Sequence, residues 1–551
     1  MLIQADTLAA VEASLRWDIP DTFNMGVAAC DAHAGREPDR TALLRWREGN
    51  EPVATSYGEL AERSNRLANL LDGLGLEPGE RVGIILPQSE WTAIAHIAIY
   101  KAGMIAVPLA RLFAPDAIEF RLKRAGVRAV ITYREGADKI ASIRDQVDML
   151  THVLVTGETV EEGEIALEPA LAACDPVFRP VATGPDTPAL IIFTSGTTGP
   201  PKGALHGHRV LPGHLPGVQI HHEFLPQVGD IAWTPADWAW AGGLLNILLP
   251  CLYFGVPVVH GGLERFDPEK AFRLMAEMKV ANAFIPPTAL RLMKTVERPR
   301  ARFDLKLRSI GSGGESLGRD TFEWAERELG ITVNEFYGQT ECNLVLSSCA
   351  KLGVSRAGAI GKPVPGHRVA VVHEDGTPCA PGERGQVAVA RPDPVMFLEY
   401  WQDPEATRAK FVGDWMLTGD QCVVDEDGYF HFVGRDDDII NSAGYRVGPG
   451  EIEDCLASHP AVRLAAAVGK PDALRTEIVK AYVVLAEGCK PDADLAEEIK
   501  AHVKARLAAN IYPREIEFVD EIPLTTTGKV IRRVFRDRAI AEARAAREDS
   551  A

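Results

Sequence analysis

The ten residues from Thr194 to Gly203 read TSGTTGPPKG and follow directly after the apolar run LIIF. Glycine, serine and threonine in such a loop bring backbone N–H groups and hydroxyls close to phosphate oxygens, and Lys202 adds a positive charge. The segment therefore predicts a phosphate-binding loop. It does not fit the Walker A motif, because Lys202 follows a proline and is not followed by serine or threonine. This argues against a P-loop kinase or motor.

Four further motifs downstream complete a pattern that resembles the adenylate-forming superfamily, which includes acyl-CoA synthetases, adenylation domains of peptide synthetases and firefly-type luciferases. They are GSGGE at 311–315, YGQTE at 337–341, TGD at 418–420 and PLTTTGK, which ends at Lys529. The resemblance covers most of the chain and is closest to the medium-chain acyl-CoA synthetases. It implies ATP and Mg²⁺ as ligands, with coenzyme A as the thiol substrate that receives the acyl group from an acyl-adenylate.

The resemblance also implies a role for each motif. Tyr337 would stack on adenine, Thr340 would contact the α-phosphate, and Glu341 would hold magnesium. An aromatic face, a hydroxyl and a carboxylate within five residues suit a base, a phosphate and a hard cation on chemical grounds as well. The implied ATP-binding set is Thr194, Ser195, Gly196, Thr197, Thr198, Gly199, Lys202, Gly313, Gly314, Glu315, Tyr337, Gly338, Gln339, Thr340, Asp420, Arg435 and Lys529, of which Lys202, Thr340 and Lys529, together with Glu341, are expected to be catalytic.

Attack of a carboxylate on the α-phosphate brings two anions together, so the site has to neutralise charge first. The resemblance implies that Lys529, magnesium on Glu341 and the loop around Lys202 do this. It also implies that a small C-terminal domain rotates about a hinge at Asp437 before the thiol attacks. The second face of that domain would bind CoA through Ala443, Gly444, Tyr445 and Arg446.

The acid is expected to be larger than acetate. In acetyl-CoA synthetases a tryptophan closes the acyl pocket at the position of Gly338, and PADWAWAGG resembles the acyl-pocket wall of medium-chain synthetases, with Trp238 and Trp240. Such aromatic residues also occur simply as core residues. Medium-chain or branched aliphatic acids are the leading expectation, and an aryl-CoA ligase is the alternative. An enzyme that loads a carrier protein, a luciferase-like oxygenase and a non-catalytic binder also remain open.

Composition limits the other classes. The chain has 551 residues, and 77 acidic against 59 basic residues give a formal charge of -18, which disfavours a broad electrostatic surface for nucleic acid. The nine cysteines show no metal-binding spacing and are expected to be reduced. Neither an export signal nor a membrane span is visible, so a cytoplasmic location is expected. The sequence leaves a homodimer as an open alternative.

The elements that position these motifs alternate between short β-rich runs and amphipathic helices, which predicts parallel sheets covered by helices. Short alternating strands from about 365 to 435 predict an antiparallel β subdomain. The predicted architecture is an α/β N-terminal AMP-binding domain over 1–436 and a mobile α+β C-terminal domain over 437–551. The last helix, RRVFRDRAIAEARAARE, is expected to be a solvated, charged tail, and five histidines between His206 and His222 are expected to be loop residues near the nucleotide.

Overall fold

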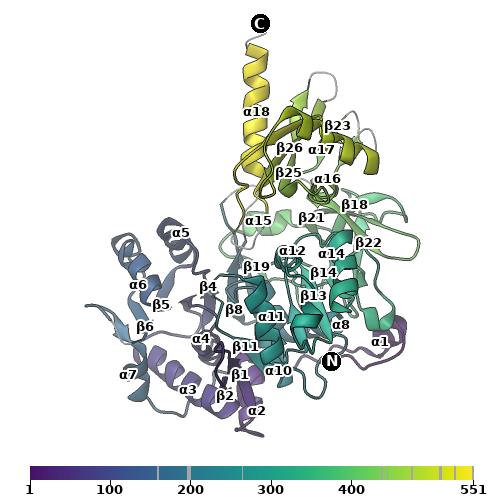
Figure 1. Ribbon diagram of the computed structural model, residues 1–551. Coiled ribbons are helices and arrows are strands. Elements are labelled where there is room, and N and C mark those ends of the chain that lie inside the picture. Colours follow the sequence, from purple (N-terminus) through teal and green to yellow (C-terminus); the bar gives the residue numbers. More distant parts are fainter. Residues whose placement is uncertain are drawn as a thin grey trace.

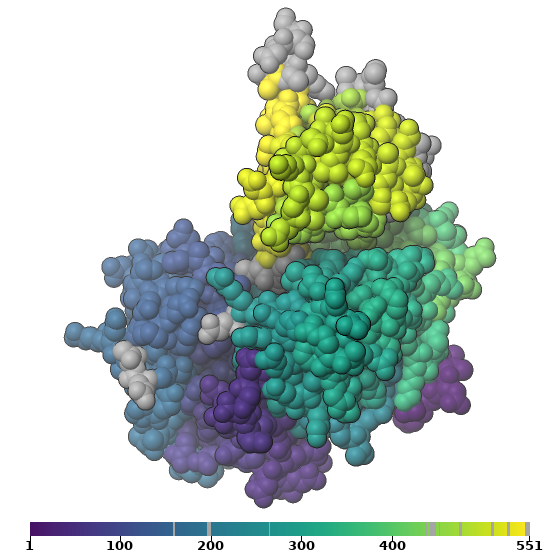
Figure 2. Space-filling view, in the orientation of Figure 1, coloured from purple at the N-terminus to yellow at the C-terminus, as the bar shows by residue number. Residues whose placement is uncertain are grey.

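The computed structural model describes residues 1–157, 160–194, 200–263, 265–435, 438–442, 445–472, 476–507, 512–525 and 529–548, without the side chains of 441–442, 445–447, 451 and 546–548. Figure 1 shows two parts: a large body built from most of the chain, and a smaller C-terminal lobe above it that ends in a projecting helix. The space-filling view shows the same lobe seated on the larger body (Figure 2). The boundary predicted at 436/437 lies outside the described residues.

An eight-stranded sheet carries the first half of the chain in the order β19-β9-β8-β4-β3-β5-β6-β7. Strands β3 to β8 pair in parallel, whereas β9 and β19 add an antiparallel edge. Helices α4 and α6 pack on these parallel strands, as the alternating sequence pattern predicts. The strands are β3 (Arg81–Ile85), β4 (Ile105–Pro108), β5 (Val127–Tyr133), β6 (His152–Thr156), β7 (Ile165–Ala166), β8 (Pro188–Phe193), β9 (Gly203–Gly207) and β19 (Glu399–Tyr400).

A nine-stranded sheet lies beside the first and has the order β16-β15-β14-β13-β12-β10-β11-β1-β2. Its central strands are parallel and end at the GSGGE and YGQTE motifs. Chain reversals add antiparallel strands at both edges. The strands are β1 (Thr41–Arg45), β2 (Val53–Ser56), β10 (Ala232–Trp233), β11 (Val258–His260), β12 (Asn282–Phe284), β13 (Ser309–Gly313), β14 (Val333–Tyr337), β15 (Leu346–Ser347) and β16 (Lys362–Pro363).

Local sequence signals explain where several helices of this body begin. Ser56 and Glu59 form a reciprocal capping box at the start of α3, and Asp267 caps α11 ahead of Pro268. The helices of the body are α1 (Leu8–Ser14), α2 (Ala32–Ala34), α3 (Tyr57–Gly73), α4 (Glu90–Lys101), α5 (Pro115–Ala125), α6 (Arg134–Ala141), α7 (Leu167–Ala172), α8 (Val210–His221), α9 (Ala241–Gly243), α10 (Leu249–Phe254), α11 (Pro268–Glu277), α12 (Pro287–Met293), α13 (Pro299–Arg302), α14 (Arg319–Trp324) and α15 (Pro404–Ala409). None of the described helices combines the length and apolar character that a bilayer crossing requires.

The region from 369 to 435 forms the predicted antiparallel module. Four strands run in the order β17-β18-β21-β20, and β22 pairs with β21. Their alternating apolar residues pack into a core shared with residues 395–400, which explains the period-two pattern of the sequence. The strands are β17 (Val369–Val372), β18 (Arg384–Ala390), β20 (Phe411–Val412), β21 (Trp415–Val424) and β22 (Phe430–Arg435).

The C-terminal lobe has its own five-stranded sheet, in the order β24-β23-β26-β25 with β27 beside β26. The expectation of a solvated final helix is wrong. Phe535 of α18 stacks on Tyr482 at 4.3 Å between ring centroids, and Ala539 is fully buried, so one face of α18 packs on the sheet. The elements are β23 (Ile440–Ser442), β24 (Tyr445–Val447), α16 (Pro449–Ala457), β25 (Val462–Asp472), β26 (Thr476–Leu485), α17 (Ala493–Arg506), β27 (Glu515–Phe518) and α18 (Arg532–Glu548).

Candidate active site

The predicted phosphate loop is the connection between β8 and β9. The backbone N–H of Thr194 donates to the carbonyl of Lys202 at 2.8 Å, which closes the base of the loop. Antiparallel pairing of Phe193 with Gly203 continues this closure. Lys202 is exposed at the end of the loop. The predicted contacts of Ser195, Gly196, Thr197, Thr198 and Gly199 lie outside the described residues.

The ends of the YGQTE and TGD motifs meet at one carboxylate. Asp420 accepts hydrogen bonds from the Tyr337 hydroxyl at 2.6 Å and from the Gln339 side chain at 2.5 Å. Arg435, its register partner on β22, lies 3.5 Å from the other carboxylate oxygen. Burial and the neighbouring Asp420 raise the pKa of Tyr337 well above its usual value, so the phenol stays protonated. These four predicted residues therefore form one cluster.

Glu341 is almost fully buried and has a partner that the sequence did not indicate. The Tyr400 hydroxyl donates to the Glu341 carboxylate at 2.5 Å. The Lys202 ammonium lies 5.2 Å from the centre of the Tyr400 ring, a distance typical of a cation–π contact. Tyr400 sits on β19, whose residues pair with β9 just after the phosphate loop. One tyrosine thus connects the predicted metal ligand with the lysine of the loop.

The GSGGE segment turns at the end of β13. Gly313 has to be glycine here, because a Cβ would lie 2.6 Å from the carbonyl oxygen of Phe336, and Gly314 has a left-handed backbone with φ 100°. Glu315 accepts a hydrogen bond from the Thr288 backbone at 2.8 Å and pairs with Arg291 at 2.9 Å. The tight turn leaves backbone at the surface facing the C-terminal lobe.

Lys529 reaches this turn from the C-terminal lobe. Its Cε lies 4.0 Å from the position that a Cβ on Gly314 would take. Lys529 is exposed to solvent. Atoms of both parts crowd the ammonium and lower its pKa, and the negative charges of Asp420 and Glu315 partly oppose that shift. The structure thus brings Lys529, the last of the residues predicted to be catalytic, close to the turn at Gly314 and to the cluster around Asp420.

The predicted hinge and CoA-binding residues lie wholly or partly outside the described residues. Asp437, Ala443 and Gly444 lie outside the described residues. Tyr445 and Arg446 are on β24, next to β23, but their side chains are not described. Their roles stay predictions.

The three residues predicted for the acyl pocket do not share one wall. Trp240 lines a narrow pocket with Phe113 and Arg121, whereas Trp238 is fully buried in the core. A Cβ on Gly338 would lie 1.1 Å from the Asn343 carbonyl oxygen. Backbone, and not an open pocket, fills the space that a side chain at 338 would enter. The glycine is required by this close approach, so its small size alone does not establish a longer acyl pocket.

Three of the five histidines lie in regular elements, His206 on β9 and His214 and His221 on α8, which corrects the expectation for them, whereas His208 and His222 lie in the adjoining turns. All five are buried. Burial lowers the pKa of His206 and His221 to about 3 and that of His208 and His214 to about 4. They are therefore neutral at physiological pH. All nine cysteines are free thiols, as expected.

The comparisons with known proteins agree with this geometry. The AMP-binding enzyme family matches residues 30–401, and the AMP-binding enzyme C-terminal domain matches residues 451–529. An uncharacterised acyl-CoA ligase of Bacillus subtilis is 36% identical over 91% of this chain and 93% of its own. The acetyl-coenzyme A synthetase of the same organism is 34% identical over 93% of this chain and 90% of its own. A mitochondrial acyl-coenzyme A synthetase of Rattus norvegicus, ACSM2, is 33% identical over 94% of this chain and 92% of its own.

Solved structures show the same architecture. The anthranilate CoA ligase AuaEII, in complex with anthranoyl-AMP, superposes with a TM-score of 0.87 at 28% identity and covers 97% of this chain and 99% of its own. An acyl-CoA synthetase of Brucella canis has a TM-score of 0.73 at 33% identity, with 97% of each chain covered. The predicted α/β fold with a smaller C-terminal domain is thereby confirmed. With both family regions in place and the motifs gathered at one site, the chain belongs to the AMP-binding enzymes, the adenylate-forming family that contains the acyl-CoA synthetases.

Proposed function

We propose that this protein is an ATP-dependent acyl-CoA synthetase that converts a carboxylic acid larger than acetate into an acyl-adenylate and then into an acyl-CoA thioester. The observation that carries the proposal is the approach of Lys529 to Gly314, beside the Asp420 cluster. A cation there faces the place where two anions, the carboxylate and the α-phosphate, have to meet. Preorganised positive charge lowers the barrier to such a reaction.

Each residue of the site would have its own role in binding ATP or in the adenylation step. Tyr337 would cover the adenine, and Asp420 with Arg435 would hold the ribose. Thr340 and Lys202 would orient the phosphates. Lys529 would offset the negative charge that develops as the carboxylate attacks, and pyrophosphate would leave. These assignments keep each polar group within reach of one bound nucleotide.

Glu341 is suited to Mg²⁺. Magnesium prefers carboxylate oxygens and commonly bridges protein and phosphate. One Glu341 oxygen accepts from Tyr400, which fixes the orientation of the carboxylate and leaves its other oxygen for the ion. Bound there, Mg²⁺ would neutralise phosphate charge.

For the second step, we propose that the C-terminal domain, from 437 onward, turns about Asp437 and presents Ala443, Gly444, Tyr445 and Arg446 to CoA. The thiol would need this change if Lys529, which lies beside Gly314 in the present arrangement, blocks the approach to the acyl carbon. Lid and domain motions of this kind commonly separate two steps of one reaction.

Medium-chain or branched aliphatic acids are the proposed substrates, supported by the similarity to ACSM2. Aromatic acids are a second candidate. The aromatic lining of the Trp240 pocket favours them, as does the similarity to the anthranilate CoA ligase.

The test is pyrophosphate release with ATP and magnesium over a panel of acetate, straight-chain, branched and aromatic acids, with and without CoA. The proposal predicts turnover that depends on CoA, yields a thioester and is greatest with an acid larger than acetate. Release that is independent of CoA, with no thioester formed, would favour the carrier-loading alternative. Preference for acetate would refute the proposed substrate class.

A further inference from the structure

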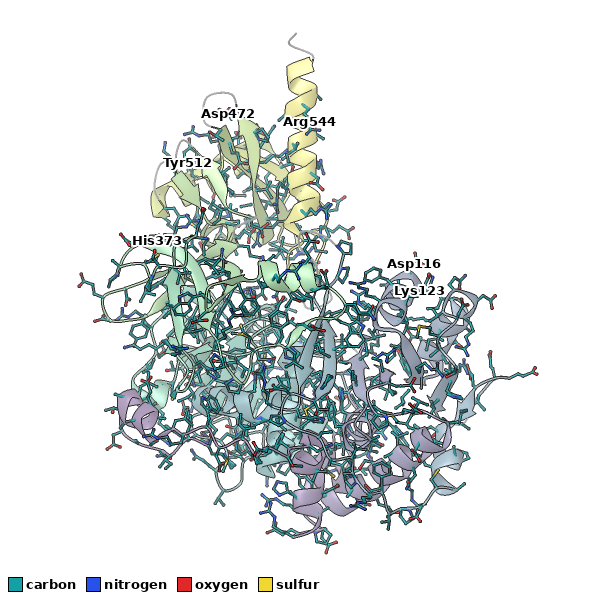
Figure 3. The ribbon with its side chains drawn as sticks, turned by 180° about the vertical axis from the view of Figure 1, so that it is seen from behind. Asp116, Lys123, His373, Asp472, Tyr512 and Arg544 are labelled. Carbon is teal, nitrogen blue, oxygen red and sulfur yellow. The ribbon has the colours of Figure 1, made fainter. Side chains whose placement is uncertain are left out.

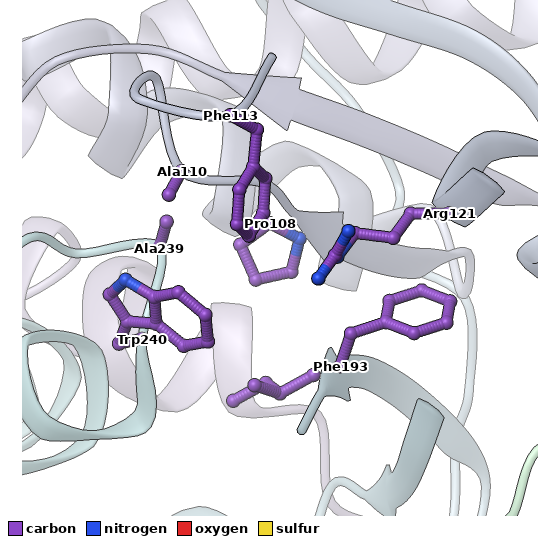
Figure 4. A pocket seen from close by; sticks show the side chains of 8 residues that line it. Pro108, Ala110, Phe113, Arg121, Phe193, Ala239 and Trp240 are labelled. Atoms are coloured by element: carbon purple, nitrogen blue, oxygen red, sulfur yellow. The ribbon is translucent and has the colours of Figure 1, made fainter. Parts of the chain in front are cut away.

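A buried arginine lines the pocket next to the phosphate loop. Arg121, on α5, is 6% exposed, and its guanidinium faces an otherwise apolar space. The walls include Pro108, Phe113, Phe193 and Trp240. Figure 4 shows the guanidinium pointing into the gap between Phe113, Phe193 and Trp240. Charged groups are rarely buried without a partner.

The Arg121 guanidinium has no counter-charge among the described residues. Its Nη1 donates to the Ala117 carbonyl of the same helix at 2.7 Å, but its buried Nε has no acceptor. Residues 195–199 follow Phe193 closely in the chain and lie outside the described residues, but their sequence contains no carboxylate. Burial lowers the pKa of Arg121 to about 10, so the group stays protonated at neutral pH. A buried charge left unpaired is costly.

Aromatic contacts offset only part of this cost. The guanidinium carbon lies 4.1 Å from the Phe113 ring centre and 5.8 Å from that of Phe193. A ring face attracts the positive charge but gives the N–H edge no oxygen acceptor. The pocket is also too narrow for a water molecule in this conformation. Among the described residues the Nε–H therefore has no protein acceptor, and the pocket leaves no room for a water molecule beside it.

The pocket adjoins the base of the predicted phosphate loop. Its residues Ile192 and Phe193 end β8, and the next residue, Thr194, closes the phosphate loop with Lys202. Trp240 meets Phe113 edge-on, with ring centres 5.8 Å apart, and closes the opposite side. An acid whose reacting carboxylate lies at the loop can place its far end here if the Trp240 side chain turns aside.

We propose that Arg121 binds the distal carboxylate of an α,ω-dicarboxylic acid, so that the substrate is activated at one end and recognised at the other. This rests on the proposed function, of which it specifies the acid. A carboxylate can accept from Nε–H and a terminal N–H of one guanidinium together, which matches the unpaired edge of Arg121. Entry of the anion would also remove the cost of the unpaired charge.

The test measures adenylation alone, as ATP–pyrophosphate exchange without CoA. Matched acid pairs are compared: butanoate with succinate, hexanoate with adipate, and octanoate with suberate. At one chain length, the dicarboxylate should have a kcat/KM on the order of 10-fold higher. Arg121→Met should lower this value about 100-fold for the dicarboxylate, by removing the partner of a buried charge, so that the preference of the wild-type enzyme for the dicarboxylate over the matched monocarboxylate is reversed.

Lys123→Met is the matched control. Lys123 lies on the same helix but on the exposed side of the molecule (Figure 3), so the preference should not change. If Arg121→Met does not fold, the ratio of kcat/KM for the dicarboxylate and the matched monocarboxylate in the wild-type enzyme still tests the inference, because that measurement needs no variant. Arg121→Lys keeps the charge but not the paired N–H edge, and should recover only part of the preference.

The outcomes separate this inference from the proposed function. If no acid of either kind supports exchange, the proposed function fails. If monocarboxylates react and the matched dicarboxylates react no better, only the assignment of Arg121 fails. If Arg121→Met leaves exchange unchanged for both acids and, in a separate assay of thioester formation, raises only the KM for CoA, Arg121 binds CoA and not the acid, and the inference is overturned.

Discussion

Tyr400 shows how a single residue can join parts of a site that are distant in sequence. It is 59 residues from Glu341, to which its hydroxyl donates, and its ring lies under the Lys202 ammonium. Burial and the adjacent Glu341 raise the pKa of Tyr400, so it remains a hydrogen-bond donor at any physiological pH. Its position suggests that it orients the carboxylate that we assign to magnesium.

Tyr400→Phe keeps the ring but removes this hydrogen bond. Because hydrogen bonds to charged groups contribute about 1.5 to 3 kcal/mol, we expect kcat/KM at limiting magnesium to fall on the order of 10-fold. Excess magnesium should restore part of the loss. The measurement is pyrophosphate exchange across a magnesium titration.

Tyr57→Phe is the control, because the Tyr57 hydroxyl is equally buried and donates to the Leu252 carbonyl at 2.7 Å in the core. It should leave the magnesium dependence unchanged. A Tyr400→Phe enzyme with wild-type magnesium dependence would show that Tyr400 only fills space.

At the scale of elements, β9 and α8 bury five histidines close together. The rings of His221 and His222 are 4.1 Å apart, and His221 also stacks on Phe336 of β14 at 4.7 Å. His214 bonds to Asn246 at 2.9 Å, and His222 bonds to Ser309 at 3.0 Å. In their neutral form, His221 and His222 pack between α8 and strands β13 and β14 of the nine-stranded sheet.

This packing predicts a loss of stability in acid. The native pKa of each histidine is below its ordinary value of 6.5. Above that pH both states are neutral, so there is no effect. As pH falls below 6.5, the histidines bind protons in the unfolded state but remain unprotonated in the native state. The free energy of unfolding should then fall by up to about 1.4 kcal/mol per pH unit for each histidine.

The dependence of stability on pH is measured by thermal unfolding between about pH 7.5 and about pH 4.5, a range that brackets the ordinary histidine pKa of about 6.5. His214→Gln should reduce the dependence of the free energy of unfolding on pH by the contribution of one histidine. Replacement of the partly exposed His152 by Asn should leave this dependence unchanged. A slope that His214→Gln leaves unchanged would refute the assignment.

At the scale of the whole molecule, the position of the C-terminal lobe on the body decides whether Lys529 reaches Gly314. Lys529 meets Gly314 only because the lobe docks on the body. Arg532, three residues later, pairs with Asp438 at 3.2 Å and also with Glu453, which ties the end of the catalytic segment to the start of the lobe. Lys529 therefore moves with the lobe as one unit.

Lys529→Met should lower adenylate formation about 100- to 1,000-fold, because one preorganised charge is lost. Thioester formation from a supplied acyl-adenylate and CoA should be retained, since we propose that this step uses the other face of the lobe. Lys490→Met, at an exposed site of the same lobe, is the control. Equal loss in both half-reactions would argue against a role confined to adenylation.

The sequence alone determined the class of the fold and most of the polar site. Period-two and helical patterns act over a few residues, so the parallel sheets, the β module and the α17 helix were predictable. Motifs such as YGQTE keep their residues together in the chain, and the structure places Tyr337 and Gln339 of this motif on Asp420; the roles that the resemblance implies for them stay predictions.

Only the tertiary structure decided the rest, because the contacts join distant segments. It placed Tyr400 on Glu341, buried the histidines that had been expected in a loop, and packed α18 on Tyr482. It also showed that the Asn343 backbone fills the space beside Gly338 and that Arg121 stands unpaired next to the phosphate loop. Shape, burial and missing partners are properties of a packed interior, which no local pattern of residues specifies.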